Sequence, residues 1–141
     1  MAGNIETSAE LLVAAKFREN GWEIYFPHKD DGFDFVAYKK EKKIFRPVQV
    51  KGKYRESSKD KTTYGYKGSL SHTHSDMVLA VVFFNKNNEP LHFAYLKYDD
   101  IKFNKNGDAK AEVCCIKDNK IKQRRDFSFL FGLEGINRLI E

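Results

Sequence analysis

The stretch GFDFVAYKKEKKIFRPVQVKGK, residues 32–53, decides which fold the chain is expected to have. Its two halves are rich in Phe, Val, Ile and Tyr, and a lysine-rich break divides them. Because residues of these types favour strands, two such runs around a short charged break predict a β-hairpin. A two-residue turn at Glu41 and Lys42 places Asp34 directly opposite Gln49.

Alternation of side chains in the second half of this stretch predicts a polar cluster. Gln49 and Lys51 share one face of their strand, while Val48 and Val50 share the other. Directly opposed residues have Cβ atoms about 5 Å apart, and diagonal neighbours about 7–8 Å. We therefore expect Asp34, Gln49 and Lys51 to lie together, unless a turn one residue longer shifts the pairing. The alternative is a surface hairpin, where an Asp–Lys pair contributes only about 0.2–1 kcal/mol and needs no function.

A carboxylate, a second oxygen ligand and a lysine form a group with a known chemistry. The oxygens suit a hard cation such as Mg²⁺. The lysine can orient a metal-bound water or offset charge on a phosphate. The pattern resembles the PD-(D/E)XK nuclease superfamily, reading here as Gly32-Phe33-Asp34 followed by Gln49-Val50-Lys51. It looks most like the branch with archaeal Holliday junction resolvases and group I intron-encoded endonucleases, some of which carry Gln-x-Lys.

The resemblance implies both a fold and a function. The fold is α/β: a restriction-endonuclease-like mixed β-sheet of about five or six strands, flanked by helices, in a single domain over residues 1–141. The function is a Mg²⁺- or Mn²⁺-dependent endonuclease that hydrolyses DNA phosphodiester bonds, often as a homo-oligomer. Asp34, Gln49 and the Val50 carbonyl would bind the metal, and Lys51 would position the attacking water. A glutamate on the first helix completes the metal site in this family, and Glu10 matches its position.

Two departures from the family pattern keep other functions open. Phe33 stands where the family has proline, and Gln49 stands where it has an acidic residue. An amide oxygen still ligates metal, but one negative charge is lost. A second hypothesis is therefore a nuclease-fold protein that binds nucleic acid without cutting it. A third is a protein-interaction module whose basic loop meets an acidic partner.

Positive charge is concentrated around the expected site. The 141-residue chain has a net charge of +5, yet residues 39–68 alone hold 11 Lys and Arg against 3 Asp and Glu. Such a stripe is typical of proteins that bind a polyanion, although a solvated lysine-rich surface has the same composition. Within it, residues 52–70 read as a long loop whose basic and aromatic groups suit phosphates and exposed bases, or as a flexible insertion. The predicted DNA contacts are Lys53, Arg55, Lys59, Lys61, Tyr64, Tyr66 and Lys67.

A first helix is expected over residues 7–20. Thr7 and Glu10 have the spacing of a capping box, and Gly21 suits the residue after the helix. Glu10 is then either a metal ligand or only the capping partner of Thr7. Glu6, one turn earlier, is the substitute ligand.

Further strands are expected at 22–27, 77–84 and 91–98, a hairpin over 111–125, and a closing helix through Leu133, Ile136 and Ile140. Residues 77–84 are apolar throughout, which predicts a buried central strand. Pro47 should face an edge or a bulge, because proline donates no ladder hydrogen bond. The segment from His72 to Asp76 reads as a loop rather than a metal site.

Neither a membrane segment nor a disulfide is expected. The longest apolar run, residues 77–84, is far too short to span a bilayer. Cys114 and Cys115 are adjacent, so their side chains point to opposite faces of a strand and cannot form an ordinary disulfide. Reduced thiols of this kind indicate a cytoplasmic protein.

Overall fold

The predicted hairpin forms with the predicted register. Strand β2 (Phe35–Lys39) runs antiparallel to β3 (Ile44–Tyr54), with Phe35 opposite Val48. The loop between them has four residues rather than two, and the backbone nitrogen of Lys43 donates to the Lys40 carbonyl at 3.2 Å. A loop with one extra residue on each side leaves every pair unchanged, which is why the register survives the wrong turn length.

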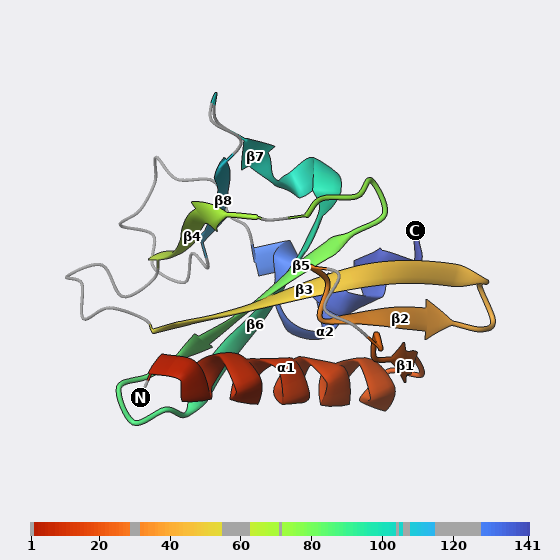
Figure 1. Ribbon diagram of the computed structural model, residues 1–141, viewed down its shortest axis with the longest axis horizontal. Coiled ribbons are helices and arrows are strands. Elements are labelled where there is room, and N and C mark those ends of the chain that lie inside the picture. Colours follow the sequence, from red (N-terminus) through yellow and green to blue (C-terminus); the bar gives the residue numbers. More distant parts are fainter. Residues whose placement is uncertain are drawn as a thin grey trace.

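A computed structural model describes residues 2–28, 32–54, 63–70, 72–103, 105, 108–114 and 128–141. Its main sheet has five strands in the order β1-β2-β3-β5-β6 (Figure 1). Strands β3 and β5 are parallel and the other neighbours are antiparallel, so the sheet is mixed, as predicted. The remaining strands of this sheet are β1 (Glu23–Tyr25), β5 (Val78–Phe84) and β6 (Pro90–Lys97).

Helix α1 (Ala2–Glu19) covers one face of this sheet and begins earlier than predicted. Thr7 therefore lies inside the helix, and the predicted capping box is wrong. The residues at the end behave as expected: Gly21 has a φ of 85°, and the Trp22 nitrogen donates to the Phe17 carbonyl at 3.0 Å. Glycine adopts this left-handed conformation without a steric penalty, which ends the helix there.

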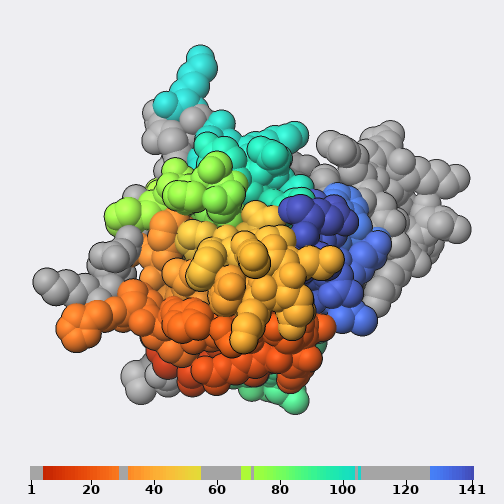
Figure 2. All heavy atoms as spheres, turned by 90° about the vertical axis from the view of Figure 1, so that its right-hand side faces the viewer, coloured from red at the N-terminus to blue at the C-terminus, as the bar shows by residue number. Residues whose placement is uncertain are grey.

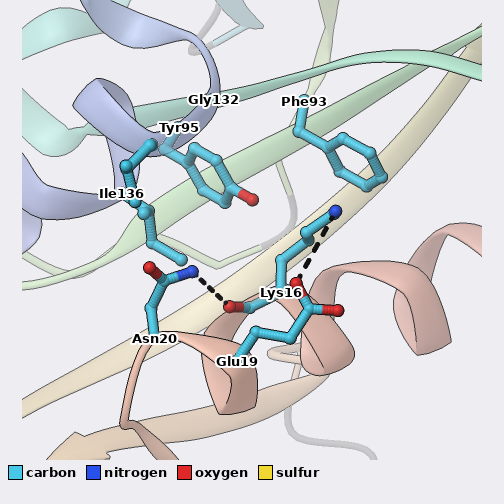
Figure 3. A pocket seen from close by; sticks show the side chains of 8 residues that line it. Lys16, Glu19, Asn20, Phe93, Tyr95, Gly132 and Ile136 are labelled. Carbon is cyan, nitrogen blue, oxygen red and sulfur yellow. Dashed lines mark hydrogen bonds and ion pairs between the residues drawn. The ribbon is translucent and has the colours of Figure 1, made fainter.

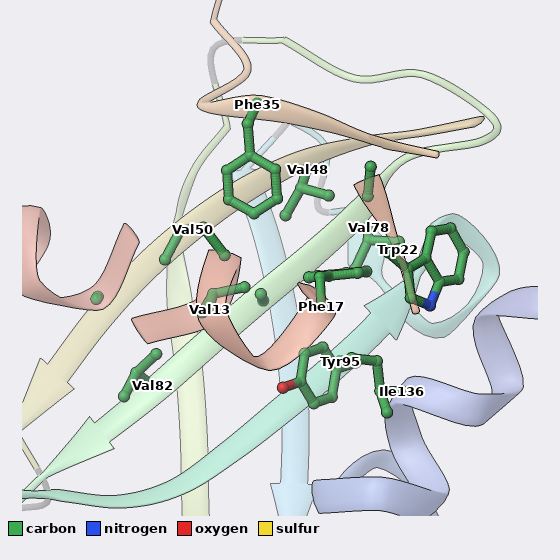
Figure 4. Packing of buried hydrophobic residues seen from close by; sticks show 14 of the residues in the cluster. Val13, Phe17, Trp22, Phe35, Val48, Val50, Val78, Val82, Tyr95 and Ile136 are labelled. Atoms are coloured by element: carbon green, nitrogen blue, oxygen red, sulfur yellow. The ribbon is translucent and has the colours of Figure 1, made fainter. Parts of the chain in front are cut away.

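The main hydrophobic core lies between α1 and the sheet. Its helical residues recur every fourth position: Ile5, Ala9, Val13 and Phe17 are all buried. In Figure 4, Phe17 lies among aromatic side chains of the core, and its ring is 5.3 Å from Trp22 and 5.9 Å from both Phe35 and Tyr95. Edge-to-face pairs of this kind each add about 0.5–1.5 kcal/mol beyond the area they bury.

A second apolar cluster covers the other face of β5 and β6. All seven residues of β5 are buried, which confirms the predicted central strand. On this face Leu79, Val81 and Phe83 pack with residues of the C-terminal segment, among them Leu130 and Phe131. The sheet is thus packed on both faces along β5, while the strands on its β1 side are packed mainly against α1.

The C-terminal segment forms a short helix at the end of the main core. Helix α2 (Gly132–Asn137) is continued by the 3₁₀ turn η3 (Arg138–Ile140). Ile136 is buried as predicted, but Leu133 is 65% exposed and Leu139 is buried instead. A 3₁₀ turn has three residues per turn, so Leu139 follows Ile136 on one face. Two other 3₁₀ turns are η1 (Tyr98–Asp100) and η2 (Ser128–Leu130).

A second, smaller sheet contains residues that were predicted as loop and hairpin. It consists of β4 (Thr63–Ser69), β8 (Asp108–Cys114) and β7 (Lys102–Phe103) in the order β4-β8-β7. The predicted loop over 52–70 is wrong at both ends, because 52–54 complete β3 and 63–69 form β4. Residues 111–114 pair with β4, and the second half of the predicted hairpin lies outside the described residues. Residues 55–62 and 115–127 lie outside the described part of the chain.

Shorter features agree with the sequence. Pro47 immediately precedes the first residue of β3 that pairs with β5, so its missing N–H leaves no gap in that ladder. Asp76 and His74 close a local turn on each other, with the Asp76 nitrogen 3.0 Å from Nδ1 of His74. No helix in the described ranges is long and apolar enough to cross a membrane.

Arg46 ties β3 to the C-terminal segment. Its side chain is only 8% exposed, and its Nε and Nη2 each lie 3.0 Å from a backbone carbonyl oxygen, that of Leu139 and that of Glu141. Nη1 lies 3.3 Å from the Asp76 carbonyl. Burial lowers the pKa of Arg46 from its ordinary value. One guanidinium thus binds two segments that are distant in sequence.

Candidate active site

The candidate site lies where β3 extends beyond β2. Strand β3 has 11 residues and β2 has five, and their described pairing ends at Val48. Beyond that point, the backbone groups of β3 that face the β2 side are outside the ladder. This open edge gives polar side chains access to the backbone near the middle of the sheet.

Asp34 binds this edge directly. Its backbone nitrogen donates to the Val48 carbonyl at 2.9 Å, one residue beyond the last described pair, Phe35 with Val48, so Asp34 lies beside the Val48–Val50 segment of β3 and its predicted pairing with Gln49 stays a prediction. Its side-chain Oδ2 accepts a hydrogen bond from the Val50 nitrogen at 2.6 Å. Hydrogen bonds to an ionised carboxylate are short and strong, so the Asp34 side chain is well positioned.

The Val50 carbonyl points toward the same edge. In a strand the N–H and C=O of one residue lie on the same side, as the exchange of both bonds within an antiparallel pair requires. Since the Val50 N–H is held by Asp34, its carbonyl oxygen also lies on the open side. The edge thus presents one carboxylate and one backbone oxygen.

Gln49 is the unusual residue of the cluster. It is 5% exposed, and its Oε1 is buried without a hydrogen-bond partner in the described structure. A buried polar atom left unpaired costs about 1–3 kcal/mol, so such an atom calls for an explanation. An oxygen that receives a ligand from outside the chain is one explanation, and the Asp34 carboxylate on the neighbouring Val50 nitrogen fits this.

Lys51 is half-buried and follows Gln49 on the same face of β3. The alternate residues Val48 and Val50 belong to the core under α1, which sets the face of Gln49 and Lys51 as the opposite one. Successive residues on one face are about 6.6 Å apart along a strand. Gln49 and Lys51 thus share the face of β3 that points away from α1, and Asp34 binds the backbone of Val50 between them.

Helix α1 contributes Glu6 to the open edge. Oε1 of Glu6 accepts a hydrogen bond from the Gly52 nitrogen at 3.2 Å. Glycine allows this close approach of α1 to β3, since a Cβ on residue 52 would lie 3.2 Å from the Ile5 carbonyl oxygen. Glu10, the predicted ligand, lies one turn further along and is half-buried. Because α1 begins at Ala2, Glu6 lies within the helix and over the end of β3. The predicted capping box at Thr7 had placed Glu6 before the helix.

The oxygens at this site suit a hard divalent cation. No group of three or more His, Cys, Asp or Glu residues that could hold a metal occurs among the described residues. The candidate set is of a different kind, with one carboxylate, one amide oxygen and one backbone carbonyl. Such oxygens are the ligands that Mg²⁺ and Mn²⁺ accept, and Mg²⁺ usually keeps several waters. The unpaired Oε1 of Gln49 is the observation that fits a metal here.

The predicted DNA contacts are only partly described. Lys53 lies near the end of β3 and is half-buried. Tyr64, Tyr66 and Lys67 belong to β4 in the second sheet, of which the structure describes the backbone. Arg55, Lys59 and Lys61 lie outside the described residues.

The pocket in Figure 3 lies elsewhere and shares no residue with the candidate site. It has a volume of about 350 Å³ and lies between α1, β6 and α2. Lys16 spans it, with Nζ 3.7 Å from a Glu19 carboxylate oxygen and 5.3 Å from the centre of the Phe93 ring. The charges of this pocket are thus paired within it.

Comparison with known structures supports the fold. The bacterial homing endonuclease I-Ssp6803I is similar to this chain, with a TM-score of 0.59 and 14% sequence identity. The similarity covers 96% of this chain and 90% of the endonuclease chain. The chain shares the fold of this endonuclease. The Holliday junction resolvase Hjc of Archaeoglobus fulgidus is similar over 76% of this chain and 83% of its own, with a TM-score of 0.48 and 10% identity. No protein-family model and no curated protein matches the sequence.

The predicted nuclease-like α/β fold is therefore confirmed: a mixed five-stranded sheet flanked by α1 and α2. The PD-(D/E)XK motif with its Gln-x-Lys variant stays a prediction, as do the roles of Asp34, Gln49 and Lys51. The support for Asp34 is its contact with the Val50 nitrogen, that for Gln49 is its buried, unpaired Oε1, and that for Lys51 is its position on the same face of β3 as Gln49.

Proposed function

We propose that the chain is a metal-dependent endonuclease that hydrolyses DNA phosphodiester bonds. The observation that carries this proposal is the buried, unpaired Oε1 of Gln49, the residue before Val50, whose N–H binds the Asp34 carboxylate at the open edge of β3. A purely structural hairpin gains nothing from such an atom, and an apolar residue at position 49 would be more stable. An oxygen kept at this cost is explained if it binds a cation.

Asp34, Gln49 and the Val50 carbonyl would hold Mg²⁺ or Mn²⁺, with Glu6 or Glu10 as a carboxylate further out. When bound, the metal would supply Lewis-acid stabilisation of the phosphodiester. The protein's own contribution is positional, because the Val50 N–H fixes the Asp34 carboxylate before any ligand arrives.

Lys51 would supply the positive charge that the reaction needs. An ammonium group beside the scissile phosphate offsets the charge that develops there, and its protons can orient the attacking water. Its half-buried position on β3 restricts its motion, which favours a defined direction for these hydrogen bonds. A homo-oligomer would bring a second such site to the other strand of a duplex.

A second candidate function has its own supporting observation. Gln49 is neutral, so Asp34 is the one carboxylate on this row of the hairpin, and a weak metal site is compatible with a protein that binds DNA without cutting it. Both candidates predict DNA binding that weakens with salt, with a slope set by the number of phosphates contacted. They differ in whether the bound DNA is cut.

Nicking of supercoiled plasmid tests the proposal. The purified chain is incubated with plasmid in Mn²⁺, in Mg²⁺ or in EDTA, and open-circular product is quantified over time. The endonuclease predicts product in either metal and none in EDTA. Salt-sensitive DNA binding with no product in any metal would assign the non-cutting function instead.

Replacing Gln49 by Leu should separate stability from activity. Leu has a similar size and removes the unpaired oxygen, so the free energy of unfolding should rise by about 1 kcal/mol. Nicking should be lost at the same time, because the site loses a metal ligand. Urea unfolding and the plasmid assay measure the two effects. A variant that is less stable and fully active would show that Oε1 is not a ligand.

Replacing Gln49 by Glu should strengthen metal binding. The substitution adds one negative charge at nearly unchanged size, beside the Asp34 carboxylate. We expect the dissociation constant for Mn²⁺, measured by calorimetry, to fall about tenfold, which corresponds to about 1.4 kcal/mol. Because two carboxylates then repel each other, the metal-free protein should be less stable than the parent. An unchanged Mn²⁺ affinity would argue against a cation site at position 49.

A further inference from the structure

An exposed aromatic surface lies on the same sheet face as the candidate site. It consists of Tyr25 on β1, Val36 and Tyr38 on β2, and Phe45 and Pro47 on β3, and is called the aromatic face below. Tyr38 pairs with Phe45, and Val36 pairs with both Tyr25 and Pro47. Directly opposed residues point to the same side of a sheet, so these five side chains form two adjacent rows.

Two of the three rings of the aromatic face are exposed to solvent, and Tyr38 is half-buried. Phe45 is 56% exposed and Tyr25 is 54% exposed. Tyr38 and Phe45 stack with ring centres 4.2 Å apart and an interplanar angle of 17°. The second apolar cluster covers β5 and β6 and includes none of these residues. A contiguous exposed apolar surface of this kind marks a binding site more often than chance exposure does.

The aromatic face leads into the candidate site along one strand. Phe45, Pro47, Gln49 and Lys51 occupy alternate positions of β3 and therefore share its face. Because a strand rises about 3.3 Å per residue, Phe45 is about 13 Å from Gln49. Stacked nucleotides of one strand are about 3.4 Å apart, so this distance matches about four nucleotides.

The surroundings of the aromatic face favour a polyanion as its occupant. The hairpin loop next to Tyr38 and Phe45 carries Lys40, Lys42 and Lys43, all exposed, with Glu41 as its one acidic residue. At the far edge, Glu23 of β1 lies opposite Tyr38 and accepts a hydrogen bond from the Tyr25 hydroxyl at 3.0 Å, so the positive charge is on the Phe45 side. Figure 2 shows the hairpin in orange and gold at the middle of the molecular surface, above α1 and beside the blue C-terminal residues. Aromatic rings beside basic side chains are the combination that proteins use to bind single-stranded nucleic acid, where bases stack and phosphates pair with cations.

We propose that the aromatic face binds unpaired bases, and that the substrate is DNA with a single-stranded segment within about four nucleotides of the cut. The binding part stands by itself, and the part about the cut rests on the proposed endonuclease function. Bases in a duplex hide their faces in the stack, so only unpaired bases can lie against Phe45 and Tyr38. The Asp34 site would then act on the strand that this surface holds.

Binding in EDTA tests the surface without any chemistry. The probes are a 5′-labelled dodecathymidylate and a duplex of the same length, titrated with the parent and with Phe45→Leu. Loss of one stacked base costs about tenfold in affinity. Phe45→Leu should therefore weaken single-strand binding about tenfold and leave duplex binding unchanged, while Phe45→Trp should restore it. Phe26→Leu is the matched control, since Phe26 is 55% exposed but packs on the core residue Phe35.

Fluorescence shows whether the ring touches bases. Trp22 is 4% exposed, so the new emission of Phe45→Trp reports on the aromatic face. We expect the oligonucleotide to quench that emission in proportion to binding. Equal single-strand affinity for Phe45→Leu, or unquenched emission at saturation, would overturn the proposal. A parent that sediments as a dimer and becomes monomeric with Phe45→Leu would overturn it too, and assign the surface to a second copy of the chain.

Cleavage of defined oligonucleotides tests the second part. A duplex with a four-nucleotide gap is compared with the same duplex without the gap, in Mn²⁺. The gapped substrate should be cut at least tenfold faster by the parent, and Phe45→Leu should remove most of this preference. Equal cutting of both substrates would overturn the substrate assignment. No cutting of either, with single-strand binding intact, would refute the endonuclease function and leave the binding surface standing.

Discussion

Replacing Asp34 by Ala is expected to lower metal-dependent nicking by at least about 10³-fold. The carboxylate is the charged ligand of the candidate site, and a metal contributes several kcal/mol of charge stabilisation, with a factor of ten for each 1.36 kcal/mol. DNA affinity in EDTA should stay within about twofold of the parent, because the change removes no phosphate contact. The rate of plasmid nicking and a binding titration measure the two quantities.

Two further substitutions separate charge from structure. Asp34→Asn keeps an oxygen that accepts the hydrogen bond from the Val50 nitrogen and removes only the charge, so it should be folded and nearly as inactive as Asp34→Ala. Asp99→Ala is the matched control, because Asp99 is an exposed carboxylate on η1. If Asp34→Asn and the parent nick at equal rates, the activity belongs to another site or to a contaminant.

Replacing Arg46 by Met should give the largest loss of stability, about 2–4 kcal/mol in the free energy of unfolding. Methionine retains the packing of the side-chain stem, but it leaves the carbonyls of Leu139, Glu141 and Asp76 without their donor. Hydrogen bonds from a charged group contribute about 1.5–3 kcal/mol each, and water compensates part of the loss at the surface. The midpoint of urea unfolding is the measurement.

The shape of the guanidinium accounts for this prediction. Arg46→Lys should recover less than half of the loss, because one ammonium group cannot reach three carbonyls that lie in different directions. Arg18→Met, at an exposed position of α1, should stay within about 0.5 kcal/mol of the parent. Equal stability of Arg46→Met and Arg18→Met would show that the three hydrogen bonds contribute nothing net.

The hairpin could be predicted from sequence because two independent signals agree on it. Its strands consist of β-branched and aromatic residues, and its register depends only on the centre of the loop, not on the loop's length. Strand β5 could be predicted equally well, since a short, continuous apolar run between polar segments is typical of a buried strand. The shared face of Gln49 and Lys51 follows from the alternation of side chains along β3, while the pairing of Asp34 with Gln49 lies one step beyond the described register.

Other elements depend on contacts that local patterns do not show. Helix α1 extends five residues before Thr7 because Ile5 packs on the sheet, which overrides the local capping signal. Strand β4 contains Thr63, Tyr64 and Tyr66 among glycines, and it becomes a strand through its pairing with β8. The burial of Gln49 could not be foreseen either, because Gln is an ordinary residue for a solvent-facing position.

The two carboxylates at the open edge of β3 have a second effect, on solubility. An unpaired strand edge offers its N–H groups to any passing chain and so promotes edge-to-edge aggregation. Here Asp34 holds the Val50 N–H and Glu6 holds the Gly52 N–H, the first two donors on that side beyond β2. Selection against aggregation would therefore favour both acids whether or not the chain cuts DNA.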